Sequence, residues 1–242
     1  MWVIILVIIL LLIVSLAIYT SFTRKKSQKT FSKRASKGAA EEQNVKSHRK
    51  GELGEYKINF QLEQLSHEFR YIGDILISKN KGFTQIDHVL ITPVGLFVIE
   101  TKNYVGKIYG SPKYNYWNQY INGSKNSFYS PIKQNEGHIK ALKVLLKSYG
   151  DIEYHSVISF TRRCELKIDL DLRTAESDTM VVYDTNLSDS ILKKYHILKK
   201  NNKQLLNENE ISKIYDTLSS ANITDVTARR EHIESVKRIN SN

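Results

Sequence analysis

The chain of 242 residues has a single cysteine, Cys164. One cysteine excludes an internal disulfide framework and any metal site built from several cysteines, and it is compatible with a reducing cytoplasm. The sequence also lacks a glycine-rich phosphate-binding loop, a Ser-His-Asp arrangement and a zinc-ligand cluster. These absences exclude several common nucleotide-binding and hydrolytic classes, so any chemistry has to come from other groups.

Charge is absent from residues 1–23, and the first 18 of them are apolar except for Ser15. About 20 apolar residues, rising about 1.5 Å each, span a bilayer core of about 30 Å. We therefore expect residues 1–23 to form a single transmembrane helix. A cleaved signal peptide is the alternative: the segment SLA at 15–17, with small residues at its first and third positions, could form a cleavage site, but no Lys or Arg precedes the apolar run.

Residues 24–37 contain seven basic residues and no acid. Basic flanks stay on the cytoplasmic side, so we expect a single-pass protein of the cell membrane with its C-terminal domain in the cytoplasm. The same stretch could contact anionic lipids. Residues 24–50 hold ten Lys/Arg and two Glu, a net +8 of the total +11, which leaves +3 for residues 51–242. High overall charge is thus weak support for nucleic-acid binding.

Beyond a basic linker at 24–46, apolar periodicity predicts an α/β fold with a mixed β-sheet flanked by helices. We assign residues 47–165 to a core, 166–222 to a remaining strand and helical cover, and 223–242 to a charged C-terminal helix. Helices are expected at 50–66, 130–150, 188–198, 207–220 and 225–239, and strands at 71–78, 85–92, 95–102, 106–111, 114–121, 154–160 and 179–184.

The segment TPVG at 92–95 fits a type I turn between two of these strands. If its two central residues form the loop, residue i faces residue 187 − i, and Asp87 lies opposite Glu100. Facing side chains have Cβ atoms about 4.5 to 5.5 Å apart, close enough for two carboxylates to bind one cation. Lys102 shares the face of Glu100 because side chains alternate. A one-residue bulge would shift this register.

Acids inside apolar strands require a partner or a metal, because buried charges are otherwise costly. Two close carboxylates raise each other's pKa unless a cation intervenes. Mg²⁺, with Mn²⁺ as a substitute, suits two carboxylates, a carbonyl and several waters, and it can activate water and stabilise a phosphoryl oxygen. Lys102 would orient or deprotonate that water, or stabilise the transition state. The alternative is a salt bridge between Lys102 and either acid, facing solvent at the sheet edge.

The pattern D-(x)12-E-x-K on adjacent strands resembles the PD-(D/E)xK nuclease superfamily, and more narrowly the nuclease-related domain, called NERD. The resemblance extends over about residues 48–145, through the blocks KGELGEY, QIDHVLITPVGLFVIETKNYVGKIYG, Trp117 and SPIKQNEGHIKAL. It implies a restriction-endonuclease-like core and metal-dependent cleavage of DNA. By position, it also implies a metal held by Asp87, Glu100 and the Thr101 carbonyl, a catalytic Lys102, and an accessory acid at Glu55.

The resemblance extends to Gln134, since related RecB-type nucleases carry a glutamine followed four residues later by tyrosine. This chain has His138 there instead, so His138 is either part of the site or a helix-surface or capping histidine. His88 alternates away from Asp87 and is expected to pack. The aromatic residues Tyr114, Tyr116, Trp117 and Tyr120 could stack on unpaired bases, or pack in the core and across strands.

The sequence therefore predicts a membrane-anchored, Mg²⁺-dependent nuclease that hydrolyses DNA phosphodiester bonds. The alternative is a catalytically inactive, membrane-tethered nucleic-acid-binding or scaffold module. The facing acids and the lysine favour the enzyme, whereas the anchor and the modest charge of residues 51–242 are equally compatible with a binding module.

Overall fold

The computed structural model describes residues 58–65, 69–79, 82–201 and 205–240. The expected membrane anchor and linker, and Glu55, lie outside these ranges. Among the described residues, no helix combines the length and apolar character needed to cross a membrane. Internal contacts divide the chain into a unit Met1–Glu52 and a unit Leu53–Asn242, and the described residues all belong to the second.

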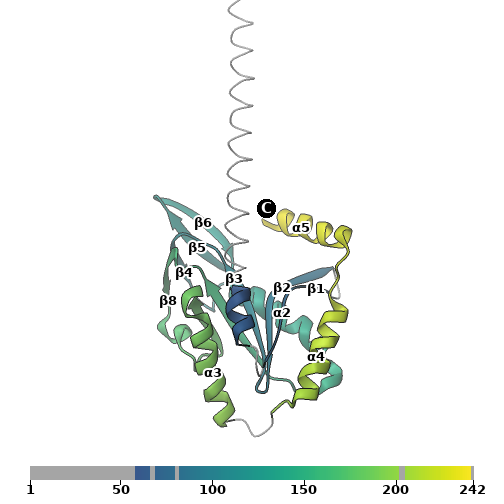
Figure 1. Cartoon of the computed structure of the whole chain (residues 1–242). Coiled ribbons are helices and arrows are strands. Elements are labelled where there is room, and N and C mark those ends of the chain that lie inside the picture. The colour runs from purple at the N-terminus through teal and green to yellow at the C-terminus, as the bar shows by residue number, and fades with distance from the viewer. Residues whose placement is uncertain (1–57, 66–68, 80–81, 202–204, 241–242) are drawn as a thin grey trace, which may run out of the picture. The chain divides into compact units, whose positions relative to one another are not determined.

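A mixed five-stranded sheet forms the centre of this unit, as the sequence predicts (Figure 1). β1, β2 and β3 form an antiparallel meander, while β7 and β9 continue the sheet parallel to β3. The order is β1-β2-β3-β7-β9, so β3 is the central strand. The strands span Arg70–Ser78, Phe83–Thr92, Gly95–Lys102, Tyr154–Phe160 and Thr179–Tyr183.

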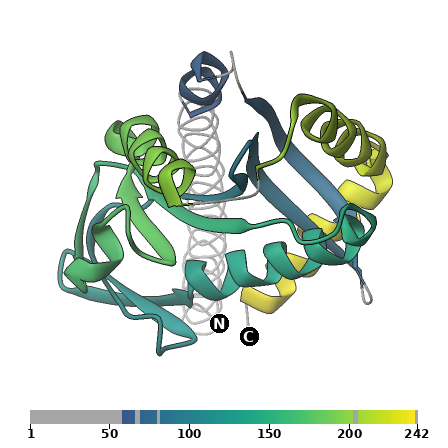
Figure 2. The ribbon, with the colours of Figure 1, turned by 90° about the horizontal axis from the view of Figure 1, so that it is seen from below.

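Helices cover both faces of this sheet because its inner strands are apolar on both sides (Figure 2). α2 (Pro131–Leu145) and α4 (Glu208–Ala221) pack against the face that carries Val89 and Val98. α3 (Leu187–Asn201) and the helical residues 58–64 pack against the opposite face, which carries Leu90 and Phe97. The expected helical cover is confirmed. A last helix, α5, spans Val226–Asn240.

A second, four-stranded sheet lies beside the first, where the sequence analysis expected only one mixed sheet. It has the order β6-β5-β4-β8 and consists of Gly106–Gly110, Tyr116–Ile121, Ser124–Tyr129 and Cys164–Ile168 for β4, β5, β6 and β8. Trp117 joins the two sheets, since its ring stacks on Phe160 of β7 with centroids 6.0 Å apart. β6 and β8 were not expected: β6 is almost wholly exposed and polar, and β8 has only five residues.

The β2–β3 hairpin has the predicted register. Thr92 pairs with Gly95 and His88 pairs with Ile99, so paired residue numbers sum to 187. The turn needs glycine at position 95, where φ is +114° and an added Cβ would lie 2.3 Å from the Glu153 carbonyl oxygen. This register fixes which β2 side chains face the end of β3.

Candidate active site

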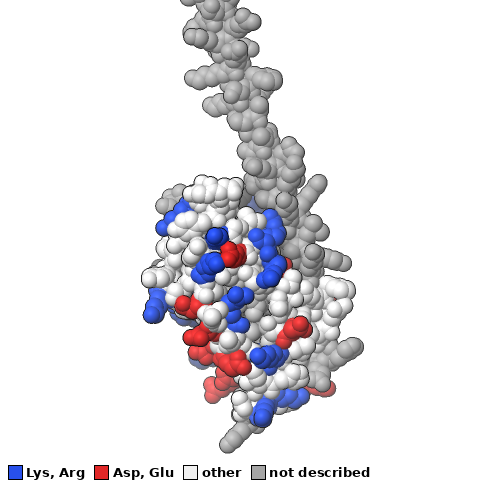
Figure 3. Space-filling model, turned by 90° about the vertical axis from the view of Figure 1, so that its left-hand side faces the viewer, with Lys and Arg blue, Asp and Glu red and all other residues white. Residues whose placement is uncertain are grey.

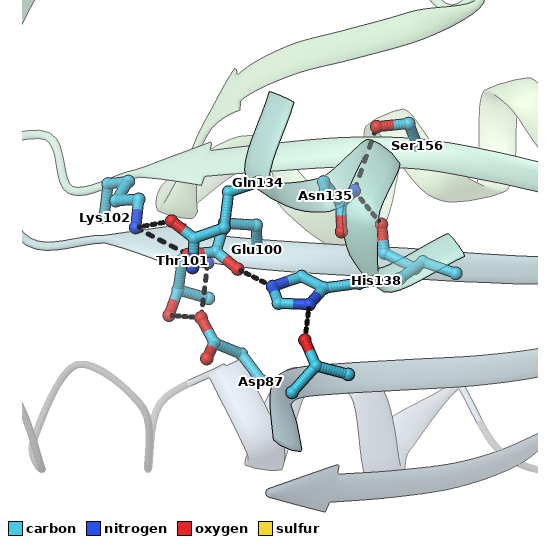
Figure 4. Close-up of polar contacts among 10 residues, drawn as sticks. Asp87, Glu100, Thr101, Lys102, Gln134, Asn135, His138 and Ser156 are labelled. Atoms are coloured by element: carbon cyan, nitrogen blue, oxygen red, sulfur yellow. Dashed lines mark hydrogen bonds and ion pairs between the residues drawn. The ribbon is translucent and has the colours of Figure 1, made fainter. Parts of the chain in front are cut away.

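The predicted acids lie where the β2–β3 pairing ends. The paired residues end at His88 and Ile99, so Asp87 and Glu100 follow just beyond the ladder. Glu100 is only 2% exposed because β3 is the central strand and α2 covers it. Figure 4 shows Asp87, Glu100 and Lys102 close together, with α2 side chains approaching from the other side. The structure therefore brings the three charged residues to one place.

Asp87 is held by the backbone of the neighbouring strand. Its Oδ2 accepts hydrogen bonds from the Thr101 backbone N and from Thr101 Oγ1, each 2.8 Å long. None of the described residues donates to Oδ1. Burial and, after it, the nearby charge of Glu100 raise the pKa of Asp87 to about 7, although Lys102 and the Thr101 hydrogen bonds oppose the rise. A bound cation would relieve both penalties, since it compensates the charge of the two acids.

Glu100 has a partner for each carboxylate oxygen. Lys102 Nζ lies 2.5 Å from Oε1, and His138 Nε2 lies 3.0 Å from Oε2. Because a carboxylate can only accept, Nε2 of His138 carries the proton in this contact. Burial alone would raise the pKa of Glu100, but Lys102 and His138 outweigh it, so the pKa lies below its ordinary value. Glu100 is therefore maintained as a buried carboxylate.

Lys102 bridges β3 and α2. Its Nζ also donates to Gln134 Oε1, 2.9 Å away. Burial would lower the pKa of Lys102, but the charges of Glu100 and Asp87 outweigh it and hold the pKa above its ordinary value. The structure thus brings Gln134, which the sequence singled out only through the family resemblance, into contact with Lys102.

Two further residues of α2 complete this network: His138, for which the sequence left two interpretations open, and Asn135. His138 is buried, not a surface or capping histidine, and its Nδ1 lies 2.8 Å from Thr84 Oγ1. Asn135 was missed, although it is fully buried and donates to the Val98 carbonyl and to Ser156 Oγ. One signal was available, since a polar residue on the inward-facing stripe of a helix needs a buried partner.

The start of α2 is fixed by local sequence. Ser130 caps the helix by accepting a hydrogen bond from the Lys133 backbone N, and Pro131 follows at the first helical position. The helix therefore begins one turn before Gln134 and directs Gln134, Asn135 and His138 toward the end of β3 (Figure 4).

The opposite face of β2 carries His88, which packs as expected. His88 is 2% exposed, and burial lowers its pKa to about 4. Its Nδ1 lies 2.9 Å from the Tyr71 hydroxyl, which donates to Asn59. A cavity of about 220 Å³ opens here, and Asp74, Gln85 and Asp87 also line it. Asp87 therefore borders this cavity while its carboxylate is held by Thr101.

The oxygen atoms at the site suit a hard divalent cation. Two carboxylates, with the Thr101 carbonyl on the same strand as Glu100, are ligand types that Mg²⁺ prefers. Oδ1 of Asp87 has no hydrogen-bond partner among the described residues, so it is the oxygen of Asp87 that could bind a cation. Across that part of the chain, no three His, Cys, Asp or Glu side chains gather as a metal-binding group. Glu55, the third acid expected here, lies outside the described ranges.

Comparisons with known proteins agree with this geometry. A family model described as a nuclease-related domain matches residues 50–161, which include the three charged residues and the start of α2. An uncharacterized protein of Bacillus anthracis is 34% identical over 187 residues, 76% of this chain and 82% of that protein. No solved structure matches. The D…ExK arrangement is consistent with placing the family in the PD-(D/E)xK superfamily. The chain therefore belongs to the nuclease-related domain family.

Proposed function

We propose that this chain is a Mg²⁺-dependent nuclease that hydrolyses DNA phosphodiester bonds. One observation carries the proposal: a buried Glu100 paired with Lys102, beside an Asp87 that is fixed by Thr101 of the neighbouring strand. Buried acids are expensive to retain, so their convergence at the end of a central strand favours a chemical role. The mixed sheet with helices on both faces supports a restriction-endonuclease-like core.

Asp87, Glu100 and the Thr101 carbonyl would hold the metal. When bound, Mg²⁺ or Mn²⁺ supplies an activated water and stabilises charge on a phosphoryl oxygen. The hydrogen bonds from Thr101 to Asp87 Oδ2 leave Oδ1 directed away from the β3 backbone contact. The same bonds hold the Asp87 carboxylate in place before the metal binds, which reduces the ordering needed on binding.

Lys102 is placed to bind a phosphate oxygen. An ammonium has three donors, and Glu100 Oε1 and Gln134 Oε1 take two of them. The third remains for a non-bridging oxygen, where it would stabilise the developing negative charge. Gln134 is a positioning residue in this scheme, since it orients Lys102 through a 2.9 Å hydrogen bond. His138 positions Glu100 in the same way.

We also propose that residues 1–23 tether this domain to the cell membrane, with the domain on the cytoplasmic side and residues 24–37 near anionic lipids. The length of the apolar run and the seven basic residues after it support this placement. Extraction of membranes from expressing cells at alkaline pH tests it: an integral protein stays in the pellet, and release into the supernatant would contradict the anchor.

A catalytically inactive nucleic-acid-binding module is the second candidate. One observation favours it: Lys102 and His138 already satisfy both oxygens of Glu100 without a metal. A site of this kind is stable as an ion-pair network alone. In that case, the protein would bind nucleic acid with strong salt dependence and leave it intact.

Incubation of the full-length chain with plasmid and with linear single-stranded DNA separates the two candidates. Wild-type protein and Asp87→Ala are compared in Mg²⁺, Mn²⁺ and EDTA. A nuclease cuts only with metal, and Asp87→Ala loses the activity while its circular dichroism spectrum stays unchanged. Binding without cleavage, by a folded wild-type protein under every metal condition, would support the inactive module. Equal cleavage by Asp87→Ala would contradict the proposed metal site.

A further inference from the structure

The second sheet exposes a set of tyrosines that the proposed chemistry does not use. Trp117 points into the core and is fully buried, as packing predicts. Five tyrosines of the same region are instead between 39% and 64% exposed: Tyr109, Tyr114, Tyr116, Tyr120 and Tyr129. Several exposed aromatic rings gathered in one segment are unusual on a protein surface, because each ring leaves apolar area in contact with water that burial would have removed.

Strand register places four of these rings on one face, which we call the tyrosine face and define as Tyr109, Tyr116, Tyr120 and Tyr129. Tyr116 and Tyr120 alternate with the buried side of β5. Tyr109 and Tyr129 belong to the strands on either side, and Tyr129 pairs directly with Tyr116. Tyr109 and Tyr120 meet edge to face at 5.3 Å, as do Tyr116 and Tyr129 at 5.9 Å. The rings therefore form a fixed array across three strands.

Lysines accompany these rings. Lys107 and Lys125 both pair with Tyr120, one from each neighbouring strand, and both are exposed. Residues 101–135 contain five lysines and no acid. The next strand, β8, adds Lys167 beside Tyr109, although this lysine pairs with Glu165 at 2.5 Å. Lys107, Lys125 and Lys167 thus lie around the tyrosine face against one acid, Glu165, which is in register with Lys107. The face carries an excess of positive charge.

The space-filling view agrees with this charge distribution. Figure 3 faces the side on which Figure 1 labels β4, β5, β6 and β8. Lysine and arginine side chains lie in both halves of this side, and in the upper part several of them surround one acidic patch, while most acidic side chains gather in the lower half. A polyanion would therefore be attracted more strongly to the upper part of this side.

The tyrosine face is also continuous with the candidate active site along the chain. The chain leaves the site at Lys102, forms β4, β5 and β6, and returns to it at Pro131, one turn before Gln134. Tyr104, in the segment between β3 and β4, stacks on Phe128 of β6 with ring centroids 4.4 Å apart and so attaches that segment to β6. A ligand on this sheet would therefore contact the segment that links the two catalytic elements.

We propose that the tyrosine face binds an unpaired nucleic-acid strand, with bases stacked on its rings and phosphates near Lys107 and Lys125. The chemistry selects this ligand: unpaired bases present the flat faces that aromatic rings stack on, and lysines meet the backbone. A duplex hides those base faces, so it would gain only the phosphate contacts. This inference deepens the proposed function and rests on it, because it assigns single-stranded substrate to the same nuclease.

The test uses the full-length Lys102→Ala chain in EDTA, so that the probe stays intact. Fluorescence anisotropy measures binding to labelled oligothymidine of about 20 nucleotides, long enough for more than one stacking site, and to a duplex of equal length. Two double variants are compared on this background: Tyr109→Leu with Tyr120→Leu, and Tyr109→Phe with Tyr120→Phe. The phenylalanine pair is the matched control, since it retains both rings.

Stacking predicts that the leucine pair loses at least about tenfold in single-strand affinity, whereas the phenylalanine pair stays within about twofold. Duplex affinity should change little in both. A second variant, Lys107→Ala with Lys125→Ala, should reduce the slope of log affinity against log salt by about 1.4 for the single strand. Lys147→Ala with Lys213→Ala is its control, since Lys147 is exposed in the short 3-10 helix Lys147–Tyr149 after α2 and Lys213 is exposed on α4.

Unchanged single-strand affinity in the leucine pair, or an equal loss in the phenylalanine pair, would overturn the proposal. If the leucine pair does not fold, the single variant Tyr116→Leu takes its place. Unchanged single-strand affinity in that variant, or an unchanged salt slope in the lysine pair, would then overturn the proposal. The chain with Lys102 intact separates this proposal from the proposed function. If the chain cleaves DNA with metal but its binding does not depend on the tyrosines, the proposed nuclease stands and the proposed stacking face is wrong. If binding depends on the tyrosines but no cleavage occurs, the stacking face stands and the proposed nuclease is wrong.

Discussion

At the scale of single residues, the site depends on how a buried acid is kept charged. Glu100 carries two partners from different elements, Lys102 of β3 and His138 of α2. Each partner is worth more here than on the surface, because an unpaired buried charge is strongly unfavourable. Asp87 differs from Glu100 because Thr101 donates to only one of its carboxylate oxygens, and the other oxygen has no partner among the described residues.

The replacement Asp87→Asn tests the metal site through stability. In the proposed function Mg²⁺ binds only the folded state, so it should raise the melting temperature of the wild type, as any ligand specific to the folded state does. Asp87→Asn should lose this rise, and without metal it should be at least as stable as the wild type, because the charge repulsion with Glu100 is gone. Thermal unfolding with Mg²⁺ or EDTA measures both effects.

Asp151→Asn is the control for that experiment. Asp151 is exposed and precedes β7, at the end of the sheet opposite to the site. It should keep the metal-induced rise. A rise of wild-type size in Asp87→Asn would show that the metal binds elsewhere.

A second prediction concerns His138. The variant His138→Leu removes one partner of a buried carboxylate and leaves Thr84 without its contact, so it should destabilise the fold by about 1 to 3 kcal/mol or more. His138→Gln keeps a donor and should recover part of that loss and part of the cleavage rate. Urea unfolding and cleavage assays measure the two. Equal effects of Leu and Gln would contradict a hydrogen-bonding role.

At the scale of elements, the site is made by one hairpin and one helix. The β2–β3 register places the acids, and α2 supplies Gln134, Asn135 and His138. The hairpin could be predicted from sequence because a two-residue turn fixes the register of every later pair. The helix was predicted as an element, but the contacts of its polar residues were not, since they join positions far apart in the chain.

Asn135 holds α2 against the sheet, so Asn135→Leu should affect both stability and catalysis. It leaves the Val98 carbonyl and Ser156 without a donor, at a cost of about 1 to 3 kcal/mol in unfolding free energy. It should also slow cleavage by loosening the helix that carries Gln134. The exposed Lys140→Ala on the same helix should stay within about 0.5 kcal/mol. Urea unfolding of both variants checks this difference.

Two glycines give opposite results for the same substitution. Gly95→Ala forces a side chain into the Glu153 backbone at a φ of +114°, so it should destabilise the fold by about 1 to 3 kcal/mol or more and disturb the hairpin register. Gly137→Ala lies in α2, where an added Cβ meets nothing within 4 Å, and should stabilise by about 0.5 to 1 kcal/mol. A change of melting temperature in the same direction for both variants would contradict this account of the turn.

At the scale of the whole molecule, sequence reasoning predicted the central sheet and its cover but not the second sheet. The strands of the first sheet are five to ten residues long, and each contains at least three buried residues in a row. β6 is mostly polar and exposed, so its strand character comes from pairing with β5 and not from burial. The sequence could not predict which of the aromatic residues are exposed for a related reason: only the strand register decides which of them face the core.

Residues 166–222, expected to supply a remaining strand and helical cover, contain β9, α3 and α4. β9 and the helices after it belong to the same unit as the site, and β9 pairs with β7 beside β3. Residues 166–222 therefore complete the central sheet and its cover. In the proposed function, the end of the first sheet would carry the chemistry and the second sheet would contact the substrate.

The most direct test of this account is the rate of Mg²⁺-dependent cleavage of single-stranded DNA by the full-length wild type beside Lys102→Ala, with Lys147→Ala as the control. The account predicts that Lys102→Ala falls by about a hundredfold or more, as expected when a donor to the transition state is removed, while Lys147→Ala keeps the wild-type rate. Wild-type activity in Lys102→Ala would contradict it.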